Sequence, residues 1–296
     1  MKMEKTLLSG GMGIPKLGLG TFNIKEENMR PAITASIEAG IRLFDTAPNY
    51  HVDVALGQAL RQTGLRREEV MIVEKVDTLQ QLHPIRRALE GCLDRLKTDY
   101  IDLYLMHWPF PGRYVDTWLQ MEQLFREGLV RSIGVCNFMP HHLAPLLTKA
   151  NMVPTVNQIE MHPLFTQKET VDYCRKRGIS IMSYTPLGRM APALINSPLL
   201  ASLAQKYSKT VPQIILRWNV QSGFIVIPKS DSPRRIRENS EIFDFSLSGT
   251  EMTGINALDC GMRLRFDPDD LRRYPLGRFH RLWLRMRAWT VNRMNK

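Results

Sequence analysis

The sequence predicts one (β/α)8 barrel of the α/β class, with a short β-hairpin before it and a basic extension after it. Eight short apolar runs alternate with amphipathic stretches of helical length along the 296 residues. The runs are continuously rich in Val, Ile and Leu, which is typical of parallel strands that helices cover on the outside. We therefore predict a barrel domain over residues 1–270 and an extension over residues 271–296.

The expected elements follow in chain order. Glycines between residues 8 and 16 predict a hairpin that joins 6–8 to 16–19. The expected barrel strands are residues 17–19, 43–45, 71–73, 101–106, 133–135, 155–158, 180–183 and 224–227. The expected helical stretches are residues 52–60, 84–97, 117–127, 140–150, 167–177, 197–219 and 233–242.

The alternative fold is a doubly wound open sheet. Gly18-Leu19-Gly20 stands at the first expected strand end, but the third glycine of a dinucleotide-binding fingerprint is missing. No acidic residue ends a second strand at the distance that this fingerprint requires. A tight turn at a strand end accounts for the two glycines, so the barrel is favoured.

The positive charge of the chain is concentrated at its C-terminus. After Asp270 there are eight basic and no acidic residues, and removing these eight charges from the net +11 leaves +3 for the body. A body of this charge offers no basic stripe, so we expect no nucleic-acid partner. In the extension Phe279, Trp283, Met286 and Trp289 fall at helical spacing, which suits contact with a membrane surface, with the barrel or with a second subunit.

Cysteine spacing and the N-terminus indicate the compartment. Cys92, Cys136, Cys174 and Cys260 form no CxxC pair and no zinc spacing, so we expect reduced thiols and no metal site. Residues 1–8 are too short of apolar residues for a signal peptide, and the chain has no run of 18 apolar residues. The sequence therefore predicts a cytoplasmic protein.

Polar side chains end the expected strands. In chain order they are Asp45, Lys75, His107, Asn137, Asn157, Gln158, Tyr184, Lys229 and Ser230. Because the active sites of such barrels lie at the C-terminal ends of the strands, closure of the barrel directs these side chains to one mouth. Each one alone is explained by a strand that reaches solvent. Together, a carboxylate, an ammonium and an imidazole from successive strands favour a catalytic site.

Tyr50, five residues after Asp45, adds a proton donor to this set. A phenol has a pKa of about 10. We expect the ammonium of Lys75 to favour the phenolate and to lower this pKa, with Asp45 holding Lys75 charged and oriented. The combination indicates general acid catalysis.

Longer motifs surround these residues. They are F-D-T-A-P-N-Y at 44–50, L-Y-L-M-H-W-P at 103–109, S-I-G-V-C-N-F at 132–138, N-Q-I-E-M-H-P at 157–163 and I-P-K-S at 227–230. In these segments the chain resembles the aldo-keto reductase superfamily, and its compact bacterial members in particular, from about Thr6 to Pro268. The resemblance implies NADPH-dependent reduction of an aldehyde or ketone to the alcohol.

The resemblance also implies roles for individual residues. Tyr50 is the implied general acid, Asp45 and Lys75 tune it, and His107 directs the substrate carbonyl. At the nicotinamide end of the cofactor, the implied binding residues are Ser132, Cys136, Asn137, Gln158 and Tyr184. The family reads the adenosine end with residues that match Lys229, Ser230, Arg235, Glu238 and Asn239. Lys and Arg there favour NADPH over NADH, because both attract the additional phosphate.

Several positions depart from the family pattern. Cys136 replaces a Ser, and Asp231 adds a carboxylate that would weaken the preference for NADPH over NADH. Phe22, Asp77 and Trp108 are the expected substrate-pocket residues, and Asp77 suggests a hydroxylated or cationic carbonyl substrate, unless it points to solvent. The loop 188–198 and the C-terminal segment are also expected to shape the pocket. An NADPH-binding regulatory or redox-sensing subunit with little turnover is the alternative function.

Overall fold

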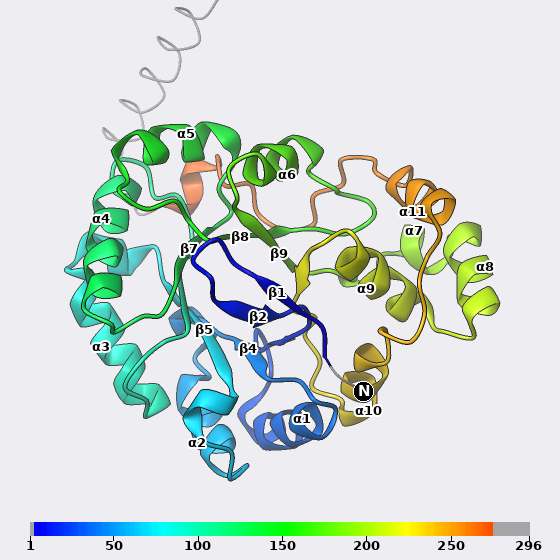
Figure 1. Cartoon of the computed structure of the whole chain (residues 1–296), viewed down its shortest axis with the longest axis horizontal. Helices are drawn as coiled ribbons and strands as arrows, with labels where there is room; N and C mark the ends of the chain where they lie inside the picture. Colours follow the sequence, from blue (N-terminus) through cyan, green and yellow to red (C-terminus); the bar gives the residue numbers. More distant parts are fainter. Residues whose placement is uncertain (1–2, 275–296) are drawn as a thin grey trace, which may run out of the picture.

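The computed structural model describes residues 3–274, which form a closed (β/α)8 barrel (Figure 1). Its parallel strands are β3 (Leu19–Gly20), β4 (Leu43–Asp45), β5 (Met71–Val76), β6 (Leu103–Met106), β7 (Ile133–Cys136), β8 (Val156–Glu160), β9 (Ser180–Tyr184) and β10 (Ile225–Val226), and each pairs with the next. The ends of this sheet meet, because the Gly18 amide donates to the Val226 carbonyl at 2.8 Å and Leu17 bridges Val226 in parallel. The predicted barrel is confirmed.

Helices cover the outside of the barrel. They are α1 (Glu26–Glu38), α2 (Asp53–Arg61), α3 (Ile85–Leu96), α4 (Tyr114–Arg126), α5 (Pro140–Lys149), α6 (Lys168–Arg175), α7 (Pro192–Ile195), α8 (Pro198–Tyr207), α9 (Val211–Gln221), α10 (Pro233–Ser240) and α11 (Gly249–Asn256). Apolar side chains of these helices pack against the outward faces of the strands, as Trp118 and Trp218 do when fully buried. This layer forms the larger part of the core.

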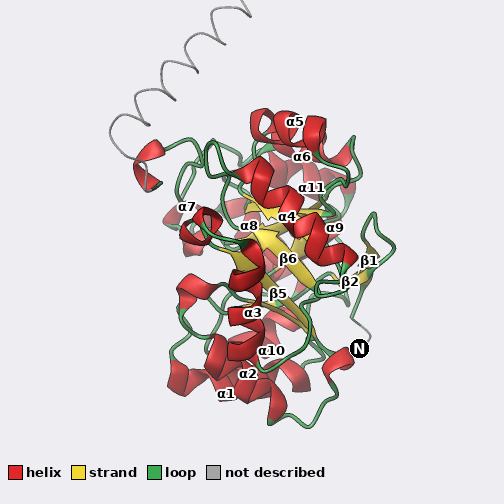
Figure 2. Ribbon diagram, turned by 90° about the vertical axis from the view of Figure 1, so that its left-hand side faces the viewer, coloured by secondary structure: helices red, strands yellow, loops and turns green. Residues whose placement is uncertain are grey.

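The predicted N-terminal hairpin is present and closes one end of the barrel. It consists of β1 (Lys5–Leu7) and β2 (Gly13–Pro15), so its second strand ends before the expected residues 16–19. Leu8 and Ile14 pack with the inward-facing side chains of the barrel strands, among them Leu105 and Val156. Figure 2 shows the hairpin on one side of the barrel and α7 on the opposite side. The open end therefore lies at the C-terminal ends of the strands.

The expected helix over residues 197–219 is two helices. Ser208 adopts a left-handed backbone with φ 53° and ends α8. Thr210 then caps α9, since its hydroxyl accepts from the Gln213 amide and the Gln213 side chain accepts from the Thr210 amide. The apolar spacing continues through this break, which is why the sequence pattern missed it. No expected stretch with stated bounds covers α1, α7 or α11, and β3 begins at Leu19 instead of Leu17.

The segment after α11 returns to the barrel. Tyr274 is buried, its ring stacks on Phe110 with 5.5 Å between ring centroids, and its hydroxyl donates to the Pro268 carbonyl at 2.8 Å. Leu271 packs beside these rings, so the described start of the expected extension contacts the barrel. The expected amphipathic helix with Phe279 and Trp289 lies outside the described residues.

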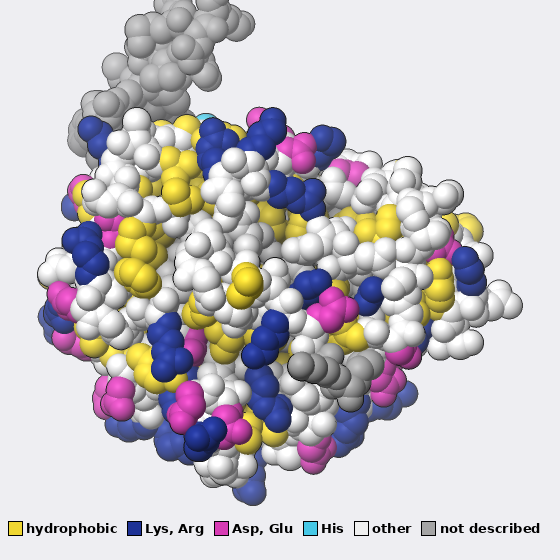
Figure 3. Space-filling view, viewed as in Figure 1, with side chains coloured by type: hydrophobic (Ala, Val, Ile, Leu, Met, Phe, Trp, Pro, Cys, Tyr) yellow, Lys and Arg dark blue, Asp and Glu magenta, His cyan; other side chains and the backbone are white. Residues whose placement is uncertain are grey.

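The surface of the described region carries charges of both signs. On the hairpin side of the molecule, Lys and Arg side chains are interspersed with Asp and Glu (Figure 3). Within residues 3–274, no helix has the length and apolar character to cross a membrane. The four cysteines are unpaired; three are buried, and Cys260 is exposed in a loop.

Candidate active site

A cavity of about 760 Å3 opens at the C-terminal ends of the barrel strands. Its walls come from the strand ends, the loop after β9, the start of α10 and the C-terminal segment. The lining residues include Phe22, Asp45, Asn49, Tyr50, His107, Trp108, Asn137, Gln158, Tyr184, Arg189, Lys229, Ser230, Asp231, Arg234, Arg235, Glu238, Asn239, Arg265 and Phe266. Most of the expected strand-end residues therefore meet at one mouth, as the closure argument predicts.

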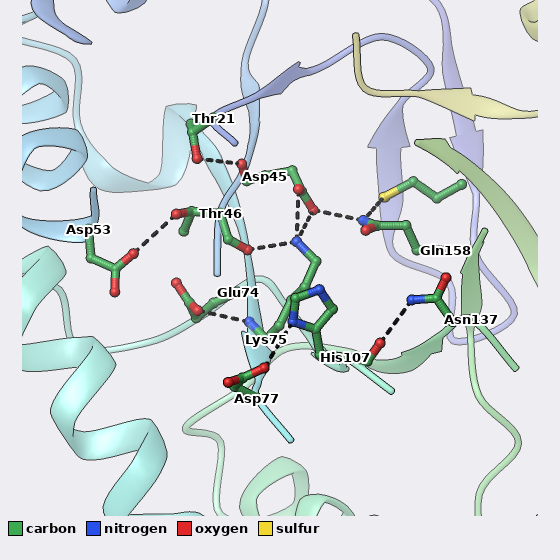
Figure 4. Close-up of polar contacts among 11 residues, drawn as sticks. Thr21, Asp45, Thr46, Asp53, Glu74, Lys75, Asp77, His107, Asn137 and Gln158 are labelled. Carbon is green, nitrogen blue, oxygen red and sulfur yellow. Dashed lines mark hydrogen bonds and ion pairs between the residues drawn. The ribbon is translucent and has the colours of Figure 1, made fainter. Parts of the chain in front are cut away.

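Asp45 and Lys75 form a buried ion pair beneath the cavity (Figure 4). The Lys75 Nζ lies 2.8 and 2.7 Å from the two Asp45 carboxylate oxygens and 2.7 Å from the Thr46 carbonyl oxygen. Lys75 is fully buried, and burial alone would lower its pKa, but the charge and hydrogen bond of Asp45, together with the nearby Tyr50 and Cys136, outweigh this and raise it. The ammonium therefore stays protonated. The pair comes from adjacent strands, β4 and β5.

Tyr50 lies directly above this pair. It ends a 3-10 turn, Pro48–Tyr50, and His51 then takes a left-handed backbone with φ 58°. The Lys75 Nζ is 5.1 Å from the centroid of the Tyr50 ring. Phe22 packs on one side of this ring at 5.0 Å and His107 on another at 6.1 Å between centroids. These neighbours fix the phenol at the cavity wall.

The pKa of Tyr50 is raised, which corrects the expected direction. Burial disfavours the phenolate most strongly, and the negative charge of Asp45 acts in the same direction. Lys75 does lower the pKa, as predicted, but burial, together with the charge of Asp45, outweighs this effect. The phenol is therefore fully protonated near neutral pH, which suits a group that gives up a proton.

His107 follows β6 and presents its ring to the cavity between Tyr50 and Trp108. Its Nδ1 is buried and lies 3.5 Å from an Asp77 carboxylate oxygen. Burial lowers the pKa of His107, and Asp77 opposes this effect. Asp77 does not line the cavity, so it does not have the place in the substrate pocket that the sequence predicts. It does not point only to solvent either, because its carboxylate faces His107. It stands behind the imidazole.

Asn137, Gln158 and Tyr184 form a linked group on the next three strands. The Asn137 Nδ2 donates to the His107 carbonyl at 3.0 Å, and its Oδ1 accepts from the Tyr184 hydroxyl at 2.7 Å. Asn137 takes a left-handed backbone with φ 63°, which a short amide side chain tolerates. The Gln158 Nε2 donates to Asp45 at 2.7 Å. Hydrogen bonds thus connect the wall of the cavity to the ion pair.

The far arm of the cavity is basic and begins at α10. Lys229 pairs with Asp231 at 3.1 Å, and Ser232 caps α10 by accepting from the Arg235 amide. Arg234 and Arg235 are exposed and have no carboxylate within 4.0 Å among the described residues. Asn239 is buried, and Glu238 accepts from the Thr210 hydroxyl at 2.9 Å. The five predicted adenosine-end residues therefore share one surface.

Two of the predicted cofactor residues, Ser132 and Cys136, do not line the cavity. Ser132 precedes β7, at the opposite end of that strand from Asn137, and its hydroxyl is bonded to Thr155 at 2.7 Å. Cys136 is buried among the inward-facing side chains of the barrel, and burial raises its pKa. Ser132 is therefore at the wrong end of the strand to reach the mouth, and Cys136 is enclosed in the packed interior of the barrel.

Other cavity residues were not singled out by the strand-end argument, although Arg265 and Phe266 lie on the C-terminal segment that was expected to shape the pocket. Arg234, Arg265 and Phe266 carry no strand-end signal, because the cavity reaches them only when helices and loops fold over the mouth. The loop after β9 contributes Arg189 and Met190, but the expected residues 192–198 belong to α7 and the start of α8. Positive φ angles at Arg189 and Met190, of 51° and 53°, are the local strain in this loop.

Among residues 3–274, two groups of metal-ligand type lie outside the cavity, and both have internal partners. His141 and His142 each place Nε2 about 3 Å from Asp269, at 2.9 and 3.0 Å. The Nδ1 of His142 accepts from a backbone amide, so its Nε2 carries the proton of a neutral ring and faces the carboxylate as a donor. In the second group, Asp53, Glu74 and Cys92, the Arg95 guanidinium contacts Asp53 and Cys92.

Comparison with known proteins finds relatives along most of the chain. The sequence model of the aldo/keto reductase family matches residues 11–259. A glyoxal reductase of Bacillus subtilis is 42% identical over 266 residues, which cover 89% of this chain and 96% of that protein. A methylglyoxal reductase, DkgA, of Yersinia pestis is 42% identical over 264 residues, with 88% and 95% covered.

Solved structures agree in fold. An aldo-keto reductase from a deep-sea metagenome library has a TM-score of 0.85 and 35% identity, covering 90% of this chain and 99% of that one. The aldo-keto reductase of Bombyx mori, solved in complex with NADP, has a TM-score of 0.84 and 33% identity, covering 93% and 98%.

Proposed function

The chain belongs to the aldo/keto reductase family and is an oxidoreductase, and from this premise we propose that it reduces small aldehydes or ketones to alcohols with Tyr50 as the proton donor. The observation that carries the proposal is the position of Tyr50. Its ring lies between the buried Lys75–Asp45 pair and His107, at the wall of the cavity. A protonated phenol at this point can deliver a proton to a bound carbonyl oxygen.

The neighbours of Tyr50 support the same reaction. Negative charge develops on the carbonyl oxygen as hydride arrives at the carbon, and hydrogen-bond donors beside it lower the barrier. Tyr50 would donate to this oxygen, and so would the ring of His107 when it is protonated. After proton transfer, the positive charge of Lys75 stabilises the phenolate, and Asp45 holds Lys75 in place.

The cavity fits a nicotinamide dinucleotide, and we assign NADPH as the preferred form. When bound, the reduced nicotinamide supplies the hydride. Asn137 and Gln158 would hold its amide and Tyr184 would stack on its ring, while Lys229, Ser230 and Arg235 would hold the phosphate of the adenosine end. Arg234 and Arg235 lack carboxylate partners within the described residues, so they are available to phosphate oxygens. Because Asp231 pairs with Lys229, it would reduce the preference for NADPH over NADH.

Small dicarbonyl compounds are the first substrates to test. The relatives named above are glyoxal and methylglyoxal reductases. Phe22 and Trp108 supply a compact apolar wall beside Tyr50 and His107, which suits a small carbonyl compound. A regulatory subunit with little turnover is not favoured, because the proton donor and its supporting groups are assembled together.

Oxidation of NADPH with methylglyoxal and an aromatic aldehyde tests the proposal. Tyr50→Phe removes the hydroxyl and should lower kcat/KM by about 100-fold to 10,000-fold. Tyr114→Phe is the matched control, because Tyr114 packs on Phe138 away from the cavity and should keep kcat/KM within about twofold. NADPH binding should be unchanged in both variants. Equal turnover by the Tyr50→Phe and wild-type proteins would refute the assignment.

A further inference from the structure

The backbone at residues 264–265 is fixed by one buried carboxylate. The Leu264 amide donates to Glu160 Oε1 at 2.7 Å and the Arg265 amide donates to Oε2 at 3.0 Å. Glu160 is 1% exposed, and its Oε1 also contacts the His162 Nε2 at 3.0 Å. Glu160 and His162 belong to the N-Q-I-E-M-H-P motif, and the proposed reduction does not use them. They anchor the chain where it crosses the cavity mouth.

This anchor directs the side chain of Arg265 to the cavity. The guanidinium carbon lies 5.1 Å from the centroid of the Phe22 ring and 5.8 Å from that of Phe266. Both rings line the same cavity as Arg265. Phe22 in turn contacts Tyr50, so one aromatic ring separates the guanidinium from the proposed proton donor. Arg265 therefore stands on the substrate side of the cavity.

The charge of Arg265 is not neutralised locally. Among residues 3–274, no carboxylate oxygen lies within 4.0 Å of its guanidinium nitrogens. The nearby acids have other partners, since Asp45 binds Lys75 and Asp77 faces His107. A guanidinium that stacks on aromatic faces keeps its N–H donors available at its edge, and these donors match a carboxylate or phosphate.

From this arrangement we propose that Arg265 selects carbonyl substrates that carry an anionic group, such as a carboxylate, a few bonds from the reacting carbonyl. The proposal rests on the proposed function and specifies its substrate class. From the sequence, a hydroxylated or cationic substrate is expected because of Asp77. The proposal replaces this with an anionic substrate, because the charged side chain on the substrate side of the cavity is the cation Arg265. The anionic end binds the fork of Arg265 while Tyr50 and His107 hold the carbonyl.

Matched substrate pairs test this selection. 4-Carboxybenzaldehyde and methyl 4-formylbenzoate share one skeleton and differ in charge, as do succinic semialdehyde and its methyl ester. In the wild type, kcat/KM should be at least about tenfold higher for the acid of one pair, and the advantage should shrink at high ionic strength. Arg265→Gln should remove this advantage while changing kcat/KM for the esters by less than about threefold.

Arg263→Gln is the matched control. Arg263 lies on the same segment, stacks on Phe165 at 4.7 Å and does not line the cavity. This variant loses the same charge, so a preserved preference in it excludes a general field effect. The Kd of NADPH should stay within about twofold in Arg265→Gln. A tenfold weaker Kd with unchanged substrate ratios would make Arg265 a cofactor residue and overturn the proposal.

Binding separates this proposal from the proposed function. 4-(Hydroxymethyl)benzoate and its methyl ester are titrated into the NADP⁺-loaded protein by calorimetry, which needs no turnover. Tighter binding of the acid in the wild type and in Arg263→Gln, lost in Arg265→Gln, supports the proposal even if no carbonyl compound is reduced. Equal affinities for acid and ester in the wild type would overturn it, whether or not the protein is a reductase.

Discussion

The floor and the rim of the cavity differ in how their charges are held. The floor comprises Asp45, Lys75, His107, Asn137 and Gln158, and the rim comprises Lys229, Arg234, Arg235 and Arg265. On the floor the side chains are buried, Asp45 binds the side chains of Lys75 and Gln158, and Asn137 binds the backbone of His107. On the rim, the cations are partly or largely exposed, and Lys229 alone among these four pairs with a carboxylate in the described chain.

This difference separates two kinds of site. Buried charges persist only when each has its partner, so the floor is both a catalytic and a structural unit. Exposed cations contribute little to stability and remain available to ligands. We therefore expect floor variants to lose stability and turnover together, and rim variants to change the choice of ligand alone.

Lys75→Met should have the largest effect. It leaves the carboxylate of Asp45 buried without its ammonium, which costs about 3–5 kcal/mol of unfolding free energy. It also removes the charge that stabilises the phenolate of Tyr50, so kcat/KM should fall by about 100-fold or more. Urea unfolding and steady-state NADPH oxidation measure the two losses.

The double variant Asp45→Asn with Lys75→Met separates these losses. Removing both charges leaves no uncompensated ion, so the free energy of unfolding should recover by about 2 kcal/mol or more relative to Lys75→Met. Turnover should not recover. If the double variant is as unstable as the single one, the ion pair is not the source of the stability of the floor.

Asp77→Asn should have an intermediate effect, visible as a changed pH profile. The Asp77 carboxylate lies 3.5 Å from the buried Nδ1 of His107 and can only accept, so it favours a neutral ring with its proton on Nδ1, in which Nε2 cannot donate to a carbonyl. Burial and Lys75 lower the pKa of His107 from 6.5, while Asp77 and Asp45 raise it. In the wild type, kcat/KM should therefore fall as the pH rises through this lowered pKa.

An amide at position 77 reverses this dependence. Asn donates to Nδ1 and keeps the proton of the neutral ring on Nε2, so the decline should disappear and kcat/KM at pH 8 should exceed the wild-type value about fivefold. Rates measured from pH 5 to 9 with one neutral aldehyde test this. A parallel decline in both proteins would contradict the assigned role of Asp77.

Asp231→Asn should have the smallest effect and act on the rim alone. It releases Lys229 from its carboxylate at 3.1 Å, so NADPH should bind about threefold more tightly while NADH changes by less than twofold. Fluorescence titration with both cofactors measures the ratio, and the unfolding midpoint should not move. Arg235→Gln is the opposite control and should weaken NADPH binding about tenfold. Equal changes for NADPH and NADH in Asp231→Asn would contradict the assignment of this arm to the additional phosphate.

The strands and the mouth of the barrel could be predicted because they follow from short-range patterns in the sequence. Apolar runs that end in Asp45, Lys75 or His107 indicated parallel strands and a common mouth, and the barrel has both. The break at Ser208 was missed because apolar spacing continues across it while one left-handed residue ends the helix. The direction of the Tyr50 pKa was missed because desolvation by neighbours from other strands outweighs the charge of Lys75.

The sequence by itself therefore determined the barrel, its order of strands and the residues at their ends, because period, composition and chain order carry this information. Only the tertiary structure decided which side chains share a charge environment. It placed Asp77 behind His107, directed Cys136 to the barrel interior and brought Arg265 across the mouth from a segment distant in sequence. Burial and charge pairing depend on neighbours that are far apart along the chain, and no local pattern specifies them.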